Sequence, residues 1–247
     1  MTLQNAGAPE HRSYNIWHQL DHRPENLALP GVAWGDRWSR PEEFRTGPVI
    51  DEHAGTDYVA MYWFRDPFEE SVRQWNDLGA DSFEWGRGPL IPGVHRSLLG
   101  FFRPVKGYVA ASALVSADVL PYRPNQGLHL TLTRYAEARS DDTHEHHRWE
   151  DRSLIPQLLS LDGVAGVWTF SFDHHQHVTM RPRDARGDSV GSMRIRLVYL
   201  DGEPLETVAR IHDAQTSAAR DLPSSAAAGA RCLMSTALRT IVPFRDW

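Results

Sequence analysis

The sequence repeats WHQLDHRPENLALPG, residues 17–31, as WEDRSLIPQLLSLDG, residues 149–163, with a constant separation of 132 positions between Trp17 and Trp149 and along the whole stretch. The identical pairs are Trp17/Trp149, Pro24/Pro156, Leu27/Leu159, Leu29/Leu161 and Gly31/Gly163. An internal repeat bears on the whole architecture, because each copy is expected to fold as one similar unit. The chain is therefore predicted to contain two copies of one unit.

A second block of matches follows in the same order. At a separation of 137 positions it pairs Tyr62, Pro67, Glu69 and Arg73 with Tyr199, Pro204, Glu206 and Arg210. The change from 132 to 137 predicts a five-residue insertion, which fits best in the polar segment 181–192. Two blocks in one order favour duplication over chance.

The elements of each copy follow from periodicity and turn residues. Copy two is predicted to contain strands at 127–135, 167–172, 193–199 and 230–242, and helices at 145–161 and 204–218. Copy one is predicted to contain helices at 14–29 and 67–78 and strands at 33–40 and 58–64. The order strand, helix, strand, strand, helix, strand is the ferredoxin-like split βαβ arrangement.

Copy one has no obvious first strand. Shifting the strand 127–135 back by 132 positions would place its start before Met1, so that strand is predicted to be missing or borrowed. The segment 108–120 is the obvious candidate to supply this strand. The repeat divides the chain into a first unit at 1–107, a connecting segment at 108–126 and a second unit at 127–247.

Composition excludes several functional classes. The 247 residues carry a net charge of -6 without a Lys/Arg-rich block, which argues against a nucleic-acid partner. No apolar stretch approaches the roughly 20 residues of a membrane helix, so we expect no membrane partner and a soluble, cytoplasmic protein. A single cysteine, Cys232, excludes an intramolecular disulfide framework and a zinc site built on several thiolates.

The run 17–31, with a Trp, an acidic residue beside a His, and a Leu-Pro-Gly turn, is followed by a strand containing Arg37. This pattern resembles the EthD-like branch of the dimeric α+β barrel superfamily. The resemblance implies an α+β fold in which two tandem ferredoxin-like units form an intramolecular barrel, with antiparallel sheets, helices outside and a small-molecule pocket. The wider superfamily includes cofactor-free monooxygenases, polyketide cyclases, lactone isomerases and haem enzymes, so fold does not settle function.

The two copies differ where chemistry is expected. His22 aligns with Leu154 and His18 aligns with Glu150, so copy one carries an ionisable ring where copy two carries an apolar residue. His18 and His22 are four residues apart and share one helix face. Pro24 is predicted to end or kink the helix, which would place His22 at a helix C-terminus where the macrodipole favours the protonated ring.

These residues suggest a site without a metal. His22 is the candidate general acid or base, and Arg37 would stabilise negative charge on a substrate oxygen. Trp17, Trp34 and Trp38, together with His18, would shape the substrate pocket. Ordinary core packing is the competing interpretation for the tryptophans and for His22.

His129 is a second catalytic candidate, and Thr131 is a candidate substrate contact. Both lie on the same face of the strand 127–135, opposite its leucines. That polar face would line a barrel interior or meet solvent. Arg194 and Arg196, on one face of the strand 193–199, would similarly reach an anionic ligand or solvent.

Metal and haem sites are the remaining alternatives. The histidine clusters at 144–147 and 174–177 lack the His-Glu-x-x-His spacing of zinc proteases, so no metal site is predicted. Aldoxime dehydratases share a similar tandem barrel and take their axial haem ligand from a helix of the second copy. His212 lies on the corresponding helix, and haem is therefore kept as a lesser alternative to having no cofactor.

The sequence as a whole favours a cofactor-independent acid–base enzyme of lyase, cyclase or isomerase type that acts on a small hydrophobic or aromatic molecule. The alternatives are a cofactor-free monooxygenase, a haem-dependent lyase similar to aldoxime dehydratases, and a non-catalytic ligand-binding accessory protein. The chain is expected to be a monomer or a homodimer.

The purified protein is expected to be colourless, because no metal-ligand spacing is present and the surroundings of His212 match haem lyases poorly. Absorbance spectroscopy and elemental analysis test this expectation. A haem Soret band, or a metal in stoichiometric amount, would replace the cofactor-free interpretation.

Overall fold

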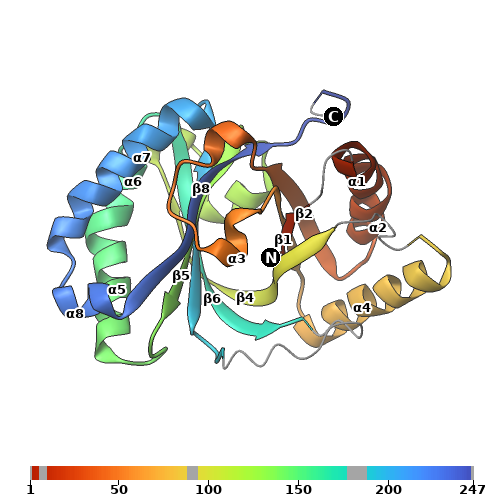
Figure 1. The fold of residues 1–247 in the computed structure, drawn as a ribbon, viewed down its shortest axis with the longest axis horizontal. Helices are drawn as coiled ribbons and strands as arrows, with labels where there is room; N and C mark the ends of the chain where they lie inside the picture. The colour runs from red at the N-terminus through yellow and green to blue at the C-terminus, as the bar shows by residue number, and fades with distance from the viewer. Residues whose placement is uncertain (1, 6–9, 88–93, 177–187, 246–247) are drawn as a thin grey trace. The chain divides into compact units, whose positions relative to one another are not determined.

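The computed structural model describes residues 2–5, 10–87, 94–176 and 188–245 (Figure 1). The chain forms two compact units. Unit 1 comprises Met1–Ser39, Gly55–Leu98 and Ile241–Trp247, and unit 2 comprises Arg40–Ala54 and Leu99–Thr240. The predicted second unit, 127–247, thus lies in unit 2 apart from its last seven residues.

Unit 2 contains an antiparallel sheet, and its helices between residues 141 and 228 pack on one face of that sheet (Figure 1). Its strands pair in the order β4-β6-β7-β5-β8. The strands are β4 (His95–Val109, from Leu99 on), β5 (Gly127–Tyr135), β6 (Val164–His175), β7 (Met193–Leu200) and β8 (Ala230–Thr240). The helices are α3 (Asp51–Ala54), α5 (Asp141–Trp149), α6 (Ile155–Leu159), α7 (Pro204–Ala218) and α8 (Ser224–Ala228). The order β6-β7-β5-β8 is ferredoxin-like, as predicted.

The helix-covered face of the unit 2 sheet is half apolar and half polar. Val198 and Leu200 of β7 pack with Leu154, Ile155 and other buried residues of the helices in one core cluster. Farther along the same strand, the alternation of side chains puts arginines on this face. The hydrophobic core therefore ends where a buried ionic cluster begins.

Unit 1 contains β1, β2 and β3, paired antiparallel in the order β1-β3-β2. Its strands are β1 (Thr2–Asn5), β2 (Val32–Ser39) and β3 (Tyr58–Phe64), and its helices are α1 (Glu10–Trp17), α2 (Arg23–Leu27) and α4 (Phe68–Glu84). The strand β1 corrects the prediction that copy one lacks its first strand. The connection from the first strand to the first helix differs in length between the copies, so the 132-residue register is not kept there.

The two units share a helical feature that the sequence did not predict. A π-helical turn spans His18–His22 in unit 1 and Glu150–Leu154 in unit 2. In unit 1 the N–H of Arg23 donates to the carbonyl of His18, and the helix continues through Pro24 instead of ending there. Because the wider turn removes the i−4 bond that proline cannot make, it accommodates the ring inside the helix.

The repeated tryptophans explain part of the sequence match. Trp17 donates its indole N–H to the carbonyl of Arg87, just beyond α4, at 3.2 Å. Trp149 donates its indole N–H to the carbonyl of Ala218, at the end of α7, at 2.7 Å. Each tryptophan thus ties the first helix of its unit to the end of the second helix.

The strand registers correct the second block of the repeat by one residue. Gly35 of β2 pairs with Tyr62, whereas the equivalent Val167 of β6 pairs with Val198. Equivalent residues of β3 and β7 are therefore 136 positions apart, and Tyr62 corresponds to Val198 instead of Tyr199. The segment 181–187, in which the insertion was placed, lies outside the described residues.

The predicted connecting segment is also corrected. Residues 95–109 form the strand β4, which the sequence analysis missed, and 108–120 is its end followed by 3-10 turns at Ala111–Ala113 and Ala117–Tyr122. The strand β4 contains Pro104 and Lys106 at a register shift beside β6, so it lacks the regular alternation that marks the other strands. Among the described residues, no helix is long and apolar enough to cross a membrane.

Leu154→Ala is expected to lower the free energy of unfolding by about 2–5 kcal/mol, because Leu154 is fully buried in the unit 2 core. Denaturant titration followed by circular dichroism measures the change. Leu114→Ala is the matched control, since Leu114 is 90% exposed and its truncation should change the free energy by less than about 0.5 kcal/mol. Equal effects of the two variants would contradict the core assignment.

Candidate functional site

The π-turn of unit 1 presents two histidines next to an aromatic cluster. The ring of His22 stacks on Trp17 at 4.6 Å between centroids and meets His18 edge-on at 5.2 Å. Tyr62 of β3 approaches the His22 ring edge-on at 6.5 Å. Asn26, one helical turn later, contacts the His22 ring and donates to the His22 carbonyl at 2.6 Å. π-Turns frequently mark functional sites, because they redirect side chains that a regular helix would space evenly.

Both histidines are held neutral. Burial, followed by the charges of Arg96 and Arg37, lowers the pKa of His22 to about 4, against an opposing effect of Asp21. Burial and the charge of Arg37 hold the pKa of His18 well below its usual range. The predicted protonated His22 at a helix C-terminus is therefore wrong, because the helix continues past this residue.

Arg37 is the central charge of this site. Its side chain is fully buried, and its guanidinium lies over the rings of Tyr58 at 4.0 Å and Tyr14 at 4.5 Å. Its polar neighbours are the hydroxyls of Tyr14 and Tyr58, but none of its three side-chain nitrogens meets the geometry of a full hydrogen bond within the described part of the chain. A buried cation without a carboxylate is costly, because the low-dielectric surroundings replace its hydration.

Other buried polar atoms near Arg37 also lack hydrogen-bond partners among the described residues. They are Asn15 Oδ1, His18 Nδ1 and Tyr62 Oη. The Tyr14 hydroxyl lies beside the Arg37 guanidinium itself. Buried polar atoms are normally paired, and a cluster of exceptions needs an explanation such as a bound ligand or water. We call this group, with His22 and Arg37, the unit 1 site.

Gly35 helps to build the unit 1 site. A Cβ atom at this position would lie 2.3 Å from the ring of Tyr62, so only glycine allows that ring to lie across β2. Unit 2 carries Val167 and Val198 at the corresponding pair and fills the space with aliphatic packing.

The structure brings together only some of the predicted site residues. Trp17, His18, His22 and Arg37 form one connected group in unit 1. Trp34 and Trp38 alternate with Arg37 on β2 and therefore lie on the opposite face of the strand. The guanidinium of Arg23 lies 5.5 Å from the Trp34 ring.

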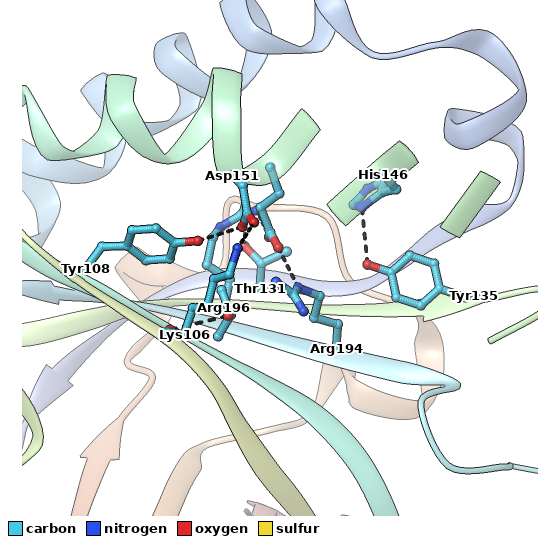
Figure 2. Close-up of polar contacts among 10 residues, drawn as sticks. Lys106, Tyr108, Thr131, Tyr135, His146, Asp151, Arg194 and Arg196 are labelled. Carbon is cyan, nitrogen blue, oxygen red and sulfur yellow. Dashed lines mark hydrogen bonds and ion pairs between the residues drawn. The ribbon is translucent and has the colours of Figure 1, made fainter. Parts of the chain in front are cut away.

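The equivalent place in unit 2 holds a buried ionic cluster (Figure 2). Glu150, which aligns with His18, accepts from Arg194 Nε at 2.5 Å and from Arg196 Nη1 at 2.7 Å. Arg196 also donates to Thr131 Oγ1 at 3.1 Å. Burial alone would raise the pKa of Glu150, but the two arginines lower it to about 2.

Three further contacts surround this cluster in Figure 2. Tyr135 Oη lies 3.1 Å from His146 Nδ1. Asp151 accepts from the hydroxyl of Tyr108 at 2.6 Å and pairs with Lys106. Burial lowers the pKa of His146 to about 4, so this histidine is neutral as well. In unit 2, the described arginines on the helix face have carboxylate partners.

His129 and Thr131 lie on the helix-covered face of unit 2 and are buried, not exposed to solvent. The His129 ring meets His212 of α7 edge-on at 5.8 Å, and its Nε2 lies 3.5 Å from Ser235 Oγ. Burial, together with Arg196 and His212, lowers the pKa of His129 to about 3. The predicted alternation of the strand is confirmed, but α7 covers its polar face.

The described residues contain no group of three His, Cys, Asp or Glu side chains that could hold a metal ion. His177, part of one predicted cluster, lies outside the described residues. Cys232 is an exposed free cysteine, and desolvation by the surrounding atoms raises the pKa of its thiol, which disfavours a reactive thiolate.

Sequence reasoning missed Tyr14 and Tyr62, and it treated Glu150 only as the residue that replaces His18. The signal for Tyr62 was Gly35, since an isolated glycine in a strand often marks the close approach of another group. The signal for the ionic cluster was the pair of arginines alternating on one strand opposite an acidic residue on a helix.

No protein-family model matches the chain, and no curated protein matches its sequence. The chain is similar in structure to a crystal structure of an anthrone oxidase-like protein, with 10% sequence identity and a TM-score of 0.52. The match covers 100% of this chain and 93% of that protein. At this identity the likeness shows the fold alone, and it confirms the predicted α+β class of the dimeric α+β barrel type.

Glu150→Gln is expected to lower the free energy of unfolding by about 3–5 kcal/mol, because it leaves Arg194 and Arg196 buried without a full counter-charge. Urea titration measures the loss. Glu145→Gln is the control, since Glu145 pairs with Arg148 at the surface. Its substitution should lower the free energy of unfolding by less than about 1 kcal/mol. Similar stability of both variants would contradict the ionic cluster.

Stability is expected to fall as the pH drops from about 6.5 towards 4. The folded-state pKa values of His22, His129, His146 and His147 are about 4, 3, 4 and 4, against 6.5 in the unfolded chain. The unfolded chain therefore binds more protons in this interval, and the free energy of unfolding decreases with falling pH. Urea unfolding at several pH values checks this sign, and a flat or rising profile between pH 7 and 5 would contradict it.

Proposed function

We propose that the protein is a cofactor-independent acid–base enzyme that removes a proton from a small hydrophobic or aromatic molecule at the unit 1 site. The observation that supports this proposal is a pair of neutral histidines beside a buried guanidinium that no described carboxylate neutralises. Structural ionic networks normally pair such a cation, as unit 2 does. In a catalytic site, a cation that stabilises the negative charge of a reacting oxygen is left without a carboxylate partner from the protein.

His22 serves as the base in this proposal. It is neutral at physiological pH and only partly buried, so it can both accept a proton from substrate and exchange it with water, whereas His18 is buried. The low pKa of His22 rises when a negative charge forms beside it. His18 then acts as a positioning residue through its edge-on contact with the His22 ring.

Arg37 stabilises the product of this deprotonation. Loss of a proton from carbon next to a carbonyl or a phenol moves negative charge onto oxygen, and the guanidinium meets that charge. Tyr14 and Tyr62 add neutral hydroxyl donors, because burial raises the pKa of both groups. Return of the proton from His22 to another carbon completes an isomerisation. In a lyase step the carbanion instead expels a leaving group from the adjacent carbon, and that group takes the proton from His22. In a cyclase step the carbanion attacks a carbonyl carbon of the same molecule, and the proton goes to the resulting alkoxide oxygen.

A cofactor-free oxygenase is the second candidate, and the structural likeness to an anthrone oxidase-like protein favours it. In this reaction the carbanion transfers electrons to O₂. A CH₂ group and O₂ give a carbonyl group and H₂O, which balances atoms and electrons without a cofactor. A ligand-binding accessory protein would use the same site without proton transfer.

His22→Ala is expected to slow deprotonation by about 100-fold to 10,000-fold, as loss of a general base does. Hydrogen–deuterium exchange at the acidic carbon of anthrone or a related aromatic ketone, followed by NMR in D₂O without O₂, measures this step directly. Oxygen uptake under air then separates an oxygenase from an isomerase or lyase.

His144→Ala is the matched control for His22→Ala, because His144 is exposed on α5 of unit 2. The control should leave exchange unchanged. If His22→Ala stays within about tenfold of the parent, His22 is not the base, and His129 becomes the next residue to test. A lower melting temperature with unchanged exchange would assign His22 to packing.

A further inference from the structure

The two units place different groups at one position of their common fold. In unit 2, the first residue of the π-turn is Glu150, and its carboxylate sits against arginines on β7. In unit 1 the first residue of the π-turn is His18, which carries no charge at neutral pH. The carboxylate that unit 2 supplies from its own helix is therefore absent from unit 1.

An arginine side chain, in contrast, is present in both units at the equivalent pair of strand residues. Arg37 of β2 pairs with Ala60 of β3, and Thr169 of β6 pairs with Arg196 of β7. Residues directly opposite in an antiparallel pair point to the same face, so each unit places a guanidinium at this pair. In unit 1 the arginine lies on β2, the first strand of the pair, whereas in unit 2 it lies on β7, the second strand.

We infer that the ligand of the unit 1 site is an aromatic carboxylate, whose carboxylate takes at Arg37 the place that Glu150 takes beside Arg196. This inference rests on the proposed location of the site and deepens it to a substrate class. The carboxylate neutralises the Arg37 guanidinium, and the charge of Arg96, which also acts on Tyr14, His18 and His22, favours the same anion.

The remaining groups of the site fit the rest of such a ligand. Tyr14, Trp17 and Tyr62 surround the site with aromatic rings, which suit an aromatic body. Tyr62 Oη is a buried donor and Asn15 Oδ1 is a buried acceptor, and neither has a hydrogen-bond partner among the described residues. A flat ligand that carries hydroxyl or carbonyl groups in addition to its carboxylate can pair with both the buried donor and the buried acceptor.

A carboxylate suits this site better than a phosphate. A dianionic phosphate needs several cationic or N–H donors, whereas a carboxylate matches one guanidinium in a two-point hydrogen bond. The side-chain carboxylate of Glu150 shows that the space between this helix turn and the sheet accommodates the group in unit 2.

The test compares the binding of aromatic acids with that of their uncharged amides, benzoate with benzamide and 2-naphthoate with 2-naphthamide, by isothermal titration calorimetry of the full chain. The parent protein is expected to bind at least one acid about tenfold or more tightly than its amide, since a buried charge pair discriminates by at least this much. Arg37→Gln should abolish the preference for the acid.

His18→Glu provides the sharper variant, because it gives unit 1 the carboxylate that unit 2 already has. It should abolish acid binding while the fold is kept, and His18→Gln, which has the same shape without the charge, should keep the preference. Circular dichroism confirms folding of each variant. A parent protein that binds no acid in preference to its amide overturns the inference, and so does a preference that survives in both His18→Glu and Arg37→Gln.

The outcome is separable from that of the proposed function, because binding is measured without turnover. If the protein prefers acids but shows no hydrogen exchange that depends on His22, the inferred ligand class is supported and the proposed enzymatic function is contradicted. If exchange depends on His22 but the protein shows no preference for acids, the proposed function is supported and the inferred ligand class is contradicted.

Discussion

A buried guanidinium must be neutralised, and the two units of this protein meet that constraint differently. In unit 2, Glu150 bonds both Arg194 and Arg196, so the helix and the sheet are joined by an internal ion pair. In unit 1, Arg37 lies between two tyrosine rings with no carboxylate bonded to it among the described residues. Because an unpaired buried charge opposes folding, we propose that a ligand supplies the missing charge in unit 1.

The same local backbone supports both solutions. A π-turn precedes the repeated proline in each unit and turns its first residue towards the sheet, where His18 or Glu150 meets the strand arginines. Replacing Glu by His at this one position removes a negative charge without changing the turn. The aliphatic pair Val167 and Val198 is correspondingly replaced by Gly35 and Tyr62, which exchanges core packing for a polar hydroxyl.

The sequence predicted the fold well where periodicity was strong. The strand 127–135 and the helix 204–218 match the structure at both ends, because alternation and an early proline mark them. The strand β4 was missed, since Pro104 and Lys106 interrupt its pattern. In the proposed site, the His22/Leu154 contrast pointed to the π-turn that carries His18 and His22, but the continuation through Pro24 and the position of Tyr62 depend on tertiary contacts. A single sequence read along the chain does not contain them.

Bromide soaking of a crystal, with anomalous diffraction, would show which arginine lacks a counter-charge, because bromide is a monovalent anion with a strong anomalous signal. We expect an anomalous peak within hydrogen-bond distance of the Arg37 guanidinium in unit 1. We expect no peak beside Arg194 or Arg196, where Glu150 already occupies the place of an anion. A peak at the unit 2 arginines with none at Arg37, or an Arg37 paired with a carboxylate of the chain itself, would contradict the account.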